Sequence, residues 1–158
     1  GDEMDRRNAK KRGSGVKPLS LDVRIDSKSA VLQVDEIFEQ RIFGAKICSA
    51  IRRTETEVDF LHFQVWRMRV LDNKTGKEIS TQLGISEPTV SRHVAKIREH
   101  IKETIMQVVM QYSFTPEEER EPSVAGMGGN DSEFDAAVSE AYHHHQLFLE
   151  KESARNQV

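Results

Sequence analysis

The sequence predicts an all-α fold, a small helical bundle extended at both ends by polar segments. Apolar residues recur every three or four positions through the middle of the chain, which is the period of a buried helix face. The helical segments follow one another after short turns, so they pack locally as a bundle. Pro, Gly and charged residues gather near both ends, where a regular core is not expected.

The composition divides the 158 residues into three predicted parts. Residues 1–33 contain a basic cluster, a Gly-Ser-Gly sequence and Pro18, and they are predicted to be a basic flexible linker. Residues 34–112 contain the main helical periodicity and are predicted to form the folded domain. Residues 113–158 are predicted to be an acidic flexible connector followed by one amphipathic helix at about 132–151, with its apolar side formed by Phe134, Val138, Ala141 and Phe148.

Four helices are predicted within the folded domain, at about 34–53, 56–72, 76–83 and 87–112. The buried positions expected for the first helix are Val34, Phe38, Ile42, Ala45 and Ile51. Those expected for the second are Val58, Leu61, Val65 and Met68, with Phe63 and Trp66 completing the core. The last helix is long because Ile105, Val108, Val109 and Tyr112 extend the apolar pattern of Val90, Val94, Ile97 and Ile101.

The third and fourth helices flank a short corner. Gly84 lies where a chain leaves a helix in a left-handed conformation, which glycine adopts readily. Ile85 is expected to fill the corner, and Ser86 is placed to cap the next helix through its hydroxyl. Pro88 is tolerated in a first turn, where its missing N–H has no helical partner. This pattern is typical of a helix-turn-helix that contacts DNA.

The expected exposed side of the last helix is polar at its start and cationic further along. That order fits base edges near the N-terminal end of the helix and phosphates beyond it. The residues on this side are Glu87, Thr89, Ser91, Arg92, Lys96 and Arg98.

The net charge of −3 conceals an uneven distribution. Residues 67–102 hold eight Lys or Arg against four Asp or Glu, so this segment is basic, as a phosphate-binding surface must be. Residues 115–158 hold three Lys or Arg against ten Asp or Glu. This acidic tail is expected to repel DNA, and to pack on the core or contact a regulator.

Several classes of protein are disfavoured. No stretch approaches the roughly 18 apolar residues that cross a bilayer, and no signal peptide is evident, so a cytoplasmic protein is expected. The single cysteine, Cys48, fits a reducing compartment and a buried packing role. Adjacent histidines such as His143-His144-His145 point in different directions on a helix, so no metal or cofactor is expected. No phosphate loop or paired nucleophile and base is recognisable, and an enzyme is not expected.

The segment from about Phe60 to Ile105 resembles region 4 of bacterial RNA polymerase sigma factors of the extracytoplasmic-function type. The matching residues are Lys77-Glu78-Ile79, Leu83-Gly84-Ile85-Ser86, Thr89-Val90 and the basic stretch Arg92 to Arg98. Val65 to Asp72 looks like the preceding helix of a C-terminally extended subgroup, and the residues leading to Leu19-Ser20-Leu21-Asp22 look like the linker between regions 2 and 4. The resemblance covers roughly residues 10–112.

The resemblance implies binding to double-stranded DNA at a promoter −35 element through the major groove, docking on the β-flap of the RNA polymerase core, and an anti-sigma protein or another regulator as a further partner. It places one group of side chains at or beside base edges, namely Glu87, Pro88, Thr89 and Arg92. It places a second group near phosphates, namely Lys77, Ser91, Lys96 and Arg98. Arg92 is the best candidate for a guanine contact, because its fork matches both major-groove acceptors, and Glu87 fits a cytosine amine.

The sequence departs from the family in one respect and leaves two alternatives open. No region 2 precedes Leu19, so the chain is expected to be either a fragment or a reduced protein that cannot start transcription alone. LuxR-type regulators share nearly the same corner, so a LuxR-like helix-turn-helix regulator that dimerises on paired half-sites is one alternative. A protein-docking module that uses the same helices to bind a partner protein is the other.

Overall fold

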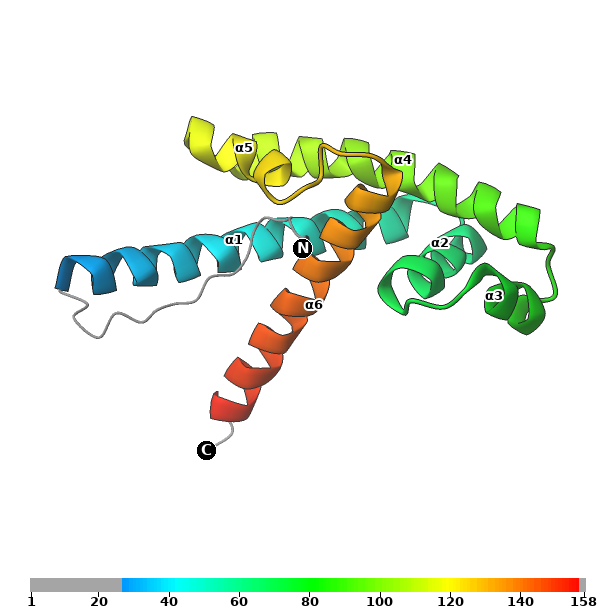
Figure 1. The fold of residues 1–158 in the computed structure, drawn as a ribbon, viewed down its shortest axis with the longest axis horizontal. Coiled ribbons are helices and arrows are strands. Elements are labelled where there is room, and N and C mark those ends of the chain that lie inside the picture. Colours follow the sequence, from blue (N-terminus) through cyan, green and yellow to red (C-terminus); the bar gives the residue numbers. More distant parts are fainter. Residues whose placement is uncertain (1–26, 157–158) are drawn as a thin grey trace, which may run out of the picture. The chain divides into compact units, whose positions relative to one another are not determined.

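The computed structural model describes residues 27–156, and this part of the chain is helical with no strand (Figure 1). The all-α prediction is therefore confirmed. The elements are α1 (Ser27–Glu57), α2 (Phe60–Trp66), the π-helical turn η1 (Arg67–Leu71), α3 (Gly76–Leu83), α4 (Glu87–Tyr112), α5 (Pro116–Val124) and α6 (Asp131–Asn156).

The chain divides into two compact units between Phe38 and Glu39, inside α1. The second unit contains the core and every contact described below. The linker predicted for residues 1–33 lies mostly outside the described residues. Residues 27–33 belong to α1, so the first helix starts seven residues before the predicted position.

The buried side of α1 differs from the predicted one. Ile51 is buried as expected, but Phe38, Ile42 and Ala45 are exposed, and the Val34 side chain lies outside the described residues. The further residues of α1 that enter the core are Ile47, Cys48, Ala50 and Thr54. Thr54 is compatible with burial because its hydroxyl donates a hydrogen bond to the Ala50 carbonyl, 2.9 Å away.

The second predicted helix is real, but it begins four residues later and ends as a π-helical turn. Asp59 caps α2 by accepting a hydrogen bond from the backbone N–H of His62. Phe63 and Trp66 are fully buried, as predicted. In η1 the N–H of Asp72 bonds to the carbonyl of Arg67, five residues back, which widens the helix.

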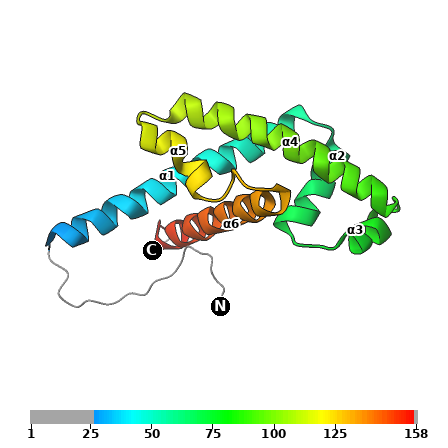
Figure 2. The same cartoon turned by 45° about the horizontal axis from the view of Figure 1, so that its top comes forward.

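The helices α3 and α4 begin and end at the predicted residues, and local hydrogen bonds define both ends of α3 and the start of α4. Thr75 and Glu78 form a reciprocal capping box at the start of α3. Gly84 ends α3 with a φ of 70°, and Ser86 caps α4 by accepting from the N–H of Thr89. Ile85 packs against the core between them. Figure 2 shows α3 and the start of α4 joined by this corner.

Replacing Gly84 with alanine is expected to lower the free energy of unfolding by about 1 kcal/mol, since a Cβ is disfavoured in the left-handed region. Gly76→Ala is the matched control. A Cβ at either glycine meets no atom within 4 Å, but Gly76 has no positive φ. The control should change stability by less than about 0.5 kcal/mol or raise it slightly. Urea unfolding of both variants measures the difference, and equal effects would contradict the assignment of strain to Gly84.

The segment predicted as a flexible connector contains a helix, which corrects that prediction. Thr115 and Glu118 form a second capping box, and Pro116 occupies the first position of α5, where proline favours a helix. The buried ammonium of Lys46 anchors this helix: it donates to the Ser113 hydroxyl at 2.9 Å and lies 4.0 Å from a carboxylate oxygen of Glu118 and of Glu121.

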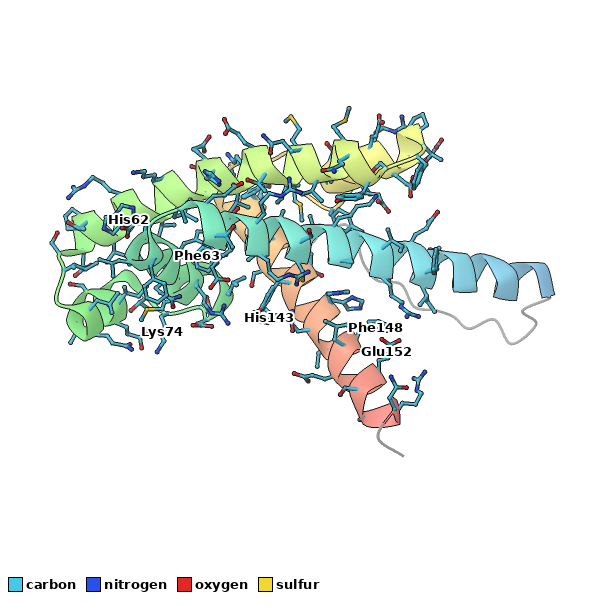
Figure 3. The ribbon with its side chains drawn as sticks, turned by 180° about the vertical axis from the view of Figure 1, so that it is seen from behind. His62, Phe63, Lys74, His143, Phe148 and Glu152 are labelled. Atoms are coloured by element: carbon cyan, nitrogen blue, oxygen red, sulfur yellow. The ribbon has the colours of Figure 1, made fainter. Side chains whose placement is uncertain are left out.

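The predicted C-terminal helix is confirmed as α6, and its apolar side packs on the core. Phe134, Ala137 and Val138 are buried there. Further along α6, Phe148 lies under the guanidinium of Arg41, whose Nη2 is 3.3 Å from Glu152 Oε2. Figure 3 shows Phe148 and Glu152 on the side of α6 that faces α1. The tail therefore packs on the core, one of its two predicted roles.

Candidate nucleic-acid interface

The N-terminal turn of α4 holds three polar side chains in one network. Ser86 Oγ lies 2.8 Å from Thr89 Oγ1, which also accepts a hydrogen bond from Arg92 Nη2 at 2.9 Å. Glu87 and Pro88 are the first two residues of the helix, and both are exposed. The structure thus brings together the side chains predicted beside base edges, on a turn whose backbone is fixed by its cap.

The exposed polar face of α4 consists of Glu87, Pro88, Thr89, Ser91, Arg92 and Lys96, of which Thr89 is half-buried and the others are exposed. On the opposite side of the helix Val90, Val94 and Ile97 are buried in the core. Lys77 is exposed at the second position of α3. A helix packed on one side and bearing exposed cations on the other has the form that enters a major groove.

Arg98, for which a phosphate contact is predicted, forms ion pairs with α6 in this structure. Its Nε and Nη2 donate to the two carboxylate oxygens of Asp135 at 2.9 and 2.7 Å, and Nη1 lies 3.5 Å from Asp131 Oδ2. Only 13% of the Arg98 side chain is exposed. A bidentate arginine–carboxylate pair of this kind is among the stronger ion pairs in proteins.

One helical turn further along α4, Lys102 pairs with the same acidic turn of α6. Its Nζ lies 3.2 Å from Asp131 Oδ1 and 3.4 Å from Glu99 Oε2. The hydrogen bond to Asp135 raises the pKa of the Arg98 guanidinium, and the hydrogen bond to Asp131 raises the pKa of Lys102. Both cations therefore keep their charge at physiological pH, and that charge is compensated within the protein.

These ion pairs between α4 and α6 are not predicted by the sequence patterns. Lys102, Asp131 and Asp135 were not predicted to act together, although the basic character of residues 67–102 and the acidic character of the tail were both evident.

Two further basic side chains lie before α3. Arg69 Nη1 donates to the Lys74 carbonyl at 3.3 Å, and both side chains belong to the basic segment.

Two histidines lie beside the exposed polar face. The rings of His62 and His93 stack with centroids 3.9 Å apart, so α2 supports α4 at this point. Figure 3 shows His62 on the side of α2 that faces α4. Burial lowers the pKa of His93 below its ordinary value of 6.5. The neighbouring charges of His62 and Arg92 lower this pKa further, and Asp59 opposes them.

This lowered pKa predicts a pH dependence of stability. The unfolded chain binds a proton at His93 more readily than the folded chain, so the stability falls as the pH drops through the ordinary pKa toward the folded-state pKa. Above the ordinary pKa the group contributes no pH dependence. Between about pH 8 and pH 5.5 the melting temperature of His93→Gln should therefore fall less than that of the wild type. His144→Gln, at an exposed position on α6, is the control; equal losses in all three proteins would contradict this origin.

The remaining candidate groups have structural surroundings. Cys48 is buried, as predicted for a packing role. This burial raises the pKa of its thiol. His143 Nε2 lies 2.7 Å from the Leu71 carbonyl oxygen and so links α6 to η1. Within the described residues no three His, Cys, Asp or Glu side chains gather as metal ligands would. None of the described helices combines the length and apolar character that crossing a bilayer requires.

A capped corner, a buried helix side and an exposed cationic side define a helix-turn-helix of the DNA-binding class. Residues 64–101 match the family model described as sigma-70, region 4. The match supports a sigma-factor region 4 domain that extends from α2 into α4, and it leaves α1, α5 and α6 outside. Domains of this family bind promoter DNA at the −35 element and dock on RNA polymerase, and they are not enzymes. No curated protein and no solved structure matched the chain.

Proposed function

We propose that this chain recognises a −35-type promoter element as the region 4 module of a sigma factor of the extracytoplasmic-function type, in the cytoplasm. The observation that most supports the proposal is the exposed polar face of α4, which follows a capped corner inside the segment that matches region 4. Arg92 presents its guanidinium to a guanine, and Glu87 accepts from a cytosine amine. Lys77, Ser91 and Lys96 contact phosphates on either side of the groove.

The same module docks on the β-flap of the RNA polymerase core in this proposal. Docking and DNA binding are assigned to different surfaces, because the exposed polar face of α4 is needed by the duplex. No step of strand opening is assigned to these residues. An anti-sigma protein or another regulator is a further proposed partner, supported by the net negative charge of residues 115–158.

The proposal is tested by selecting bound sequences from a random duplex library with the full chain, and by copurification with core RNA polymerase. We expect one asymmetric element and retention of the polymerase core. A palindromic footprint occupied by two copies, without polymerase, would instead favour the LuxR-like alternative. Retention of the polymerase with no selected duplex would favour a protein-docking module.

A further inference from the structure

Two cations of α4 are held by carboxylates from outside the region 4 segment. Arg98 and Lys102 are bound by Asp135 and Asp131, which lie in the first two turns of α6. Figures 1 and 2 both show the N-terminal end of α6 beside α4. We call the two carboxylates, Asp131 and Asp135, the acidic clasp.

The acidic clasp lies on one flank of α4. Arg98 follows Ser91 by seven residues and Lys102 follows Arg98 by four, so all three share one side of the helix. Arg92 and Lys96 point away from this flank, and within the described residues neither forms an ion pair. The clasp therefore neutralises the downstream cations and leaves the base-contacting turn accessible.

The contact between α6 and the helix-turn-helix is not fully closed. A cleft of about 700 Å³ separates η1 and α4 from α6. One wall presents Arg69 and Arg98, and the other presents Asp131, Asp135 and Glu140. The carboxylates of α6 already accept hydrogen bonds from Arg98 and Lys102, which a duplex phosphate would otherwise contact. These carboxylates are negatively charged, so they also repel an approaching phosphate.

We propose that the N-terminal turns of α6 act as an intramolecular phosphate mimic, which competes with the DNA backbone for Arg98 and Lys102. This rests on the proposed function, since it assumes that α4 enters DNA. Before a duplex phosphate can contact Arg98 or Lys102, their ion pairs with Asp131 and Asp135 must break. The affinity of the protein for DNA is therefore lower than it would be if both cations were unpaired. Any partner that draws α6 away from α4 strengthens DNA binding.

The test uses the full chain with Asp131→Asn and Asp135→Asn combined, and a random-sequence duplex as the probe of phosphate contacts. We expect about tenfold tighter binding, equivalent to roughly 1.4 kcal/mol. We also expect a salt dependence of log K that is steeper by up to about 2, because each newly engaged phosphate contributes about −0.9 to the slope. Both values come from titrations across a series of salt concentrations.

Removing two negative charges anywhere on the protein strengthens its attraction to DNA, so the control variant removes two negative charges outside the acidic clasp. Glu119→Gln combined with Glu150→Gln alters two exposed carboxylates, on α5 and α6, that form no ion pair within the described residues. Binding and salt slope equal to those of this control would overturn the proposal, even with DNA binding intact. If no protein of the series binds duplex, the proposed function fails as well.

A second comparison remains informative if the double variant is less stable. Arg98→Ala removes both the ion pair with the acidic clasp and the phosphate contact. These two losses act on DNA affinity in opposite directions, so in the wild-type background the net effect should be small. In the Asp131→Asn, Asp135→Asn background only the phosphate contact remains to be lost, and the same substitution should weaken binding several-fold. Equal effects in both backgrounds would show that Arg98 does not exchange between the two anions.

Discussion

Replacing Arg92 and Lys96 together by alanine is expected to abolish retention of the protein on duplex DNA at low salt. Both side chains are exposed on α4 and are free of the α6 carboxylates that hold Arg98. Loss of a bidentate guanine contact costs about 1–3 kcal/mol, and loss of a phosphate contact adds to it, so the affinity should fall about a hundredfold or more. Fluorescence anisotropy with a selected duplex measures the loss.

The matched control is Arg120→Ala combined with Lys151→Ala. It removes one arginine and one lysine from exposed positions on α5 and α6, so the net charge changes equally. This control should bind almost as the wild type does. Unchanged binding by the Arg92 and Lys96 variant would eliminate α4 as the DNA-contacting helix and favour a protein-docking role.

Ile97→Ala is expected to lower the free energy of unfolding by about 2–5 kcal/mol, because it opens a cavity where the side chain is fully buried. Ile97 lies on the side of α4 opposite Arg92, within the cluster that includes Ile79 of α3 and Trp66 of α2. The substitution should therefore loosen the helix-turn-helix and weaken DNA binding only through the loss of folded protein. Chemical denaturation followed by circular dichroism measures the change.

Met106→Ala provides the comparison on the same helix. Met106 is 67% exposed, and alanine is an excellent helix former, so the stability should change by less than about 0.5 kcal/mol. Similar losses at both positions would contradict the burial pattern of α4.

The parts of the fold that the sequence predicted well are those defined by local chemistry. Both ends of α3 and the start of α4 follow from Thr75, Gly84 and Ser86, whose hydrogen bonds and backbone angles involve neighbours within five residues. The same chemistry was present at Thr115, Pro116 and Glu118, but the prolines and glutamates were interpreted as features of a flexible connector. A proline at the first position of a helix and a glutamate two residues later favour helix formation instead.

The parts that could not be predicted depend on contacts between distant segments. Phe38, Ile42 and Ala45 of α1 were predicted to be buried and are exposed, whereas Ile47 and Ala50 belong to a core cluster formed with residues from other helices. Within the candidate site, the network of Ser86, Thr89 and Arg92 lies within seven consecutive residues, so it depends on local sequence. The partner of Arg98 is 37 residues away, and periodicity carries no information about such a pair.

The π-helical turn η1 has a consequence for how the small domain is assembled. A regular α-helix presents a single narrow apolar stripe, yet Met68, Val70 and Leu71 are all buried within five residues. The additional residue in the turn broadens this stripe, so that one short segment packs against α3 on one side and against α6 on another. Helix α3 of the helix-turn-helix and helix α6 therefore both pack on the same five-residue segment, which couples their positions.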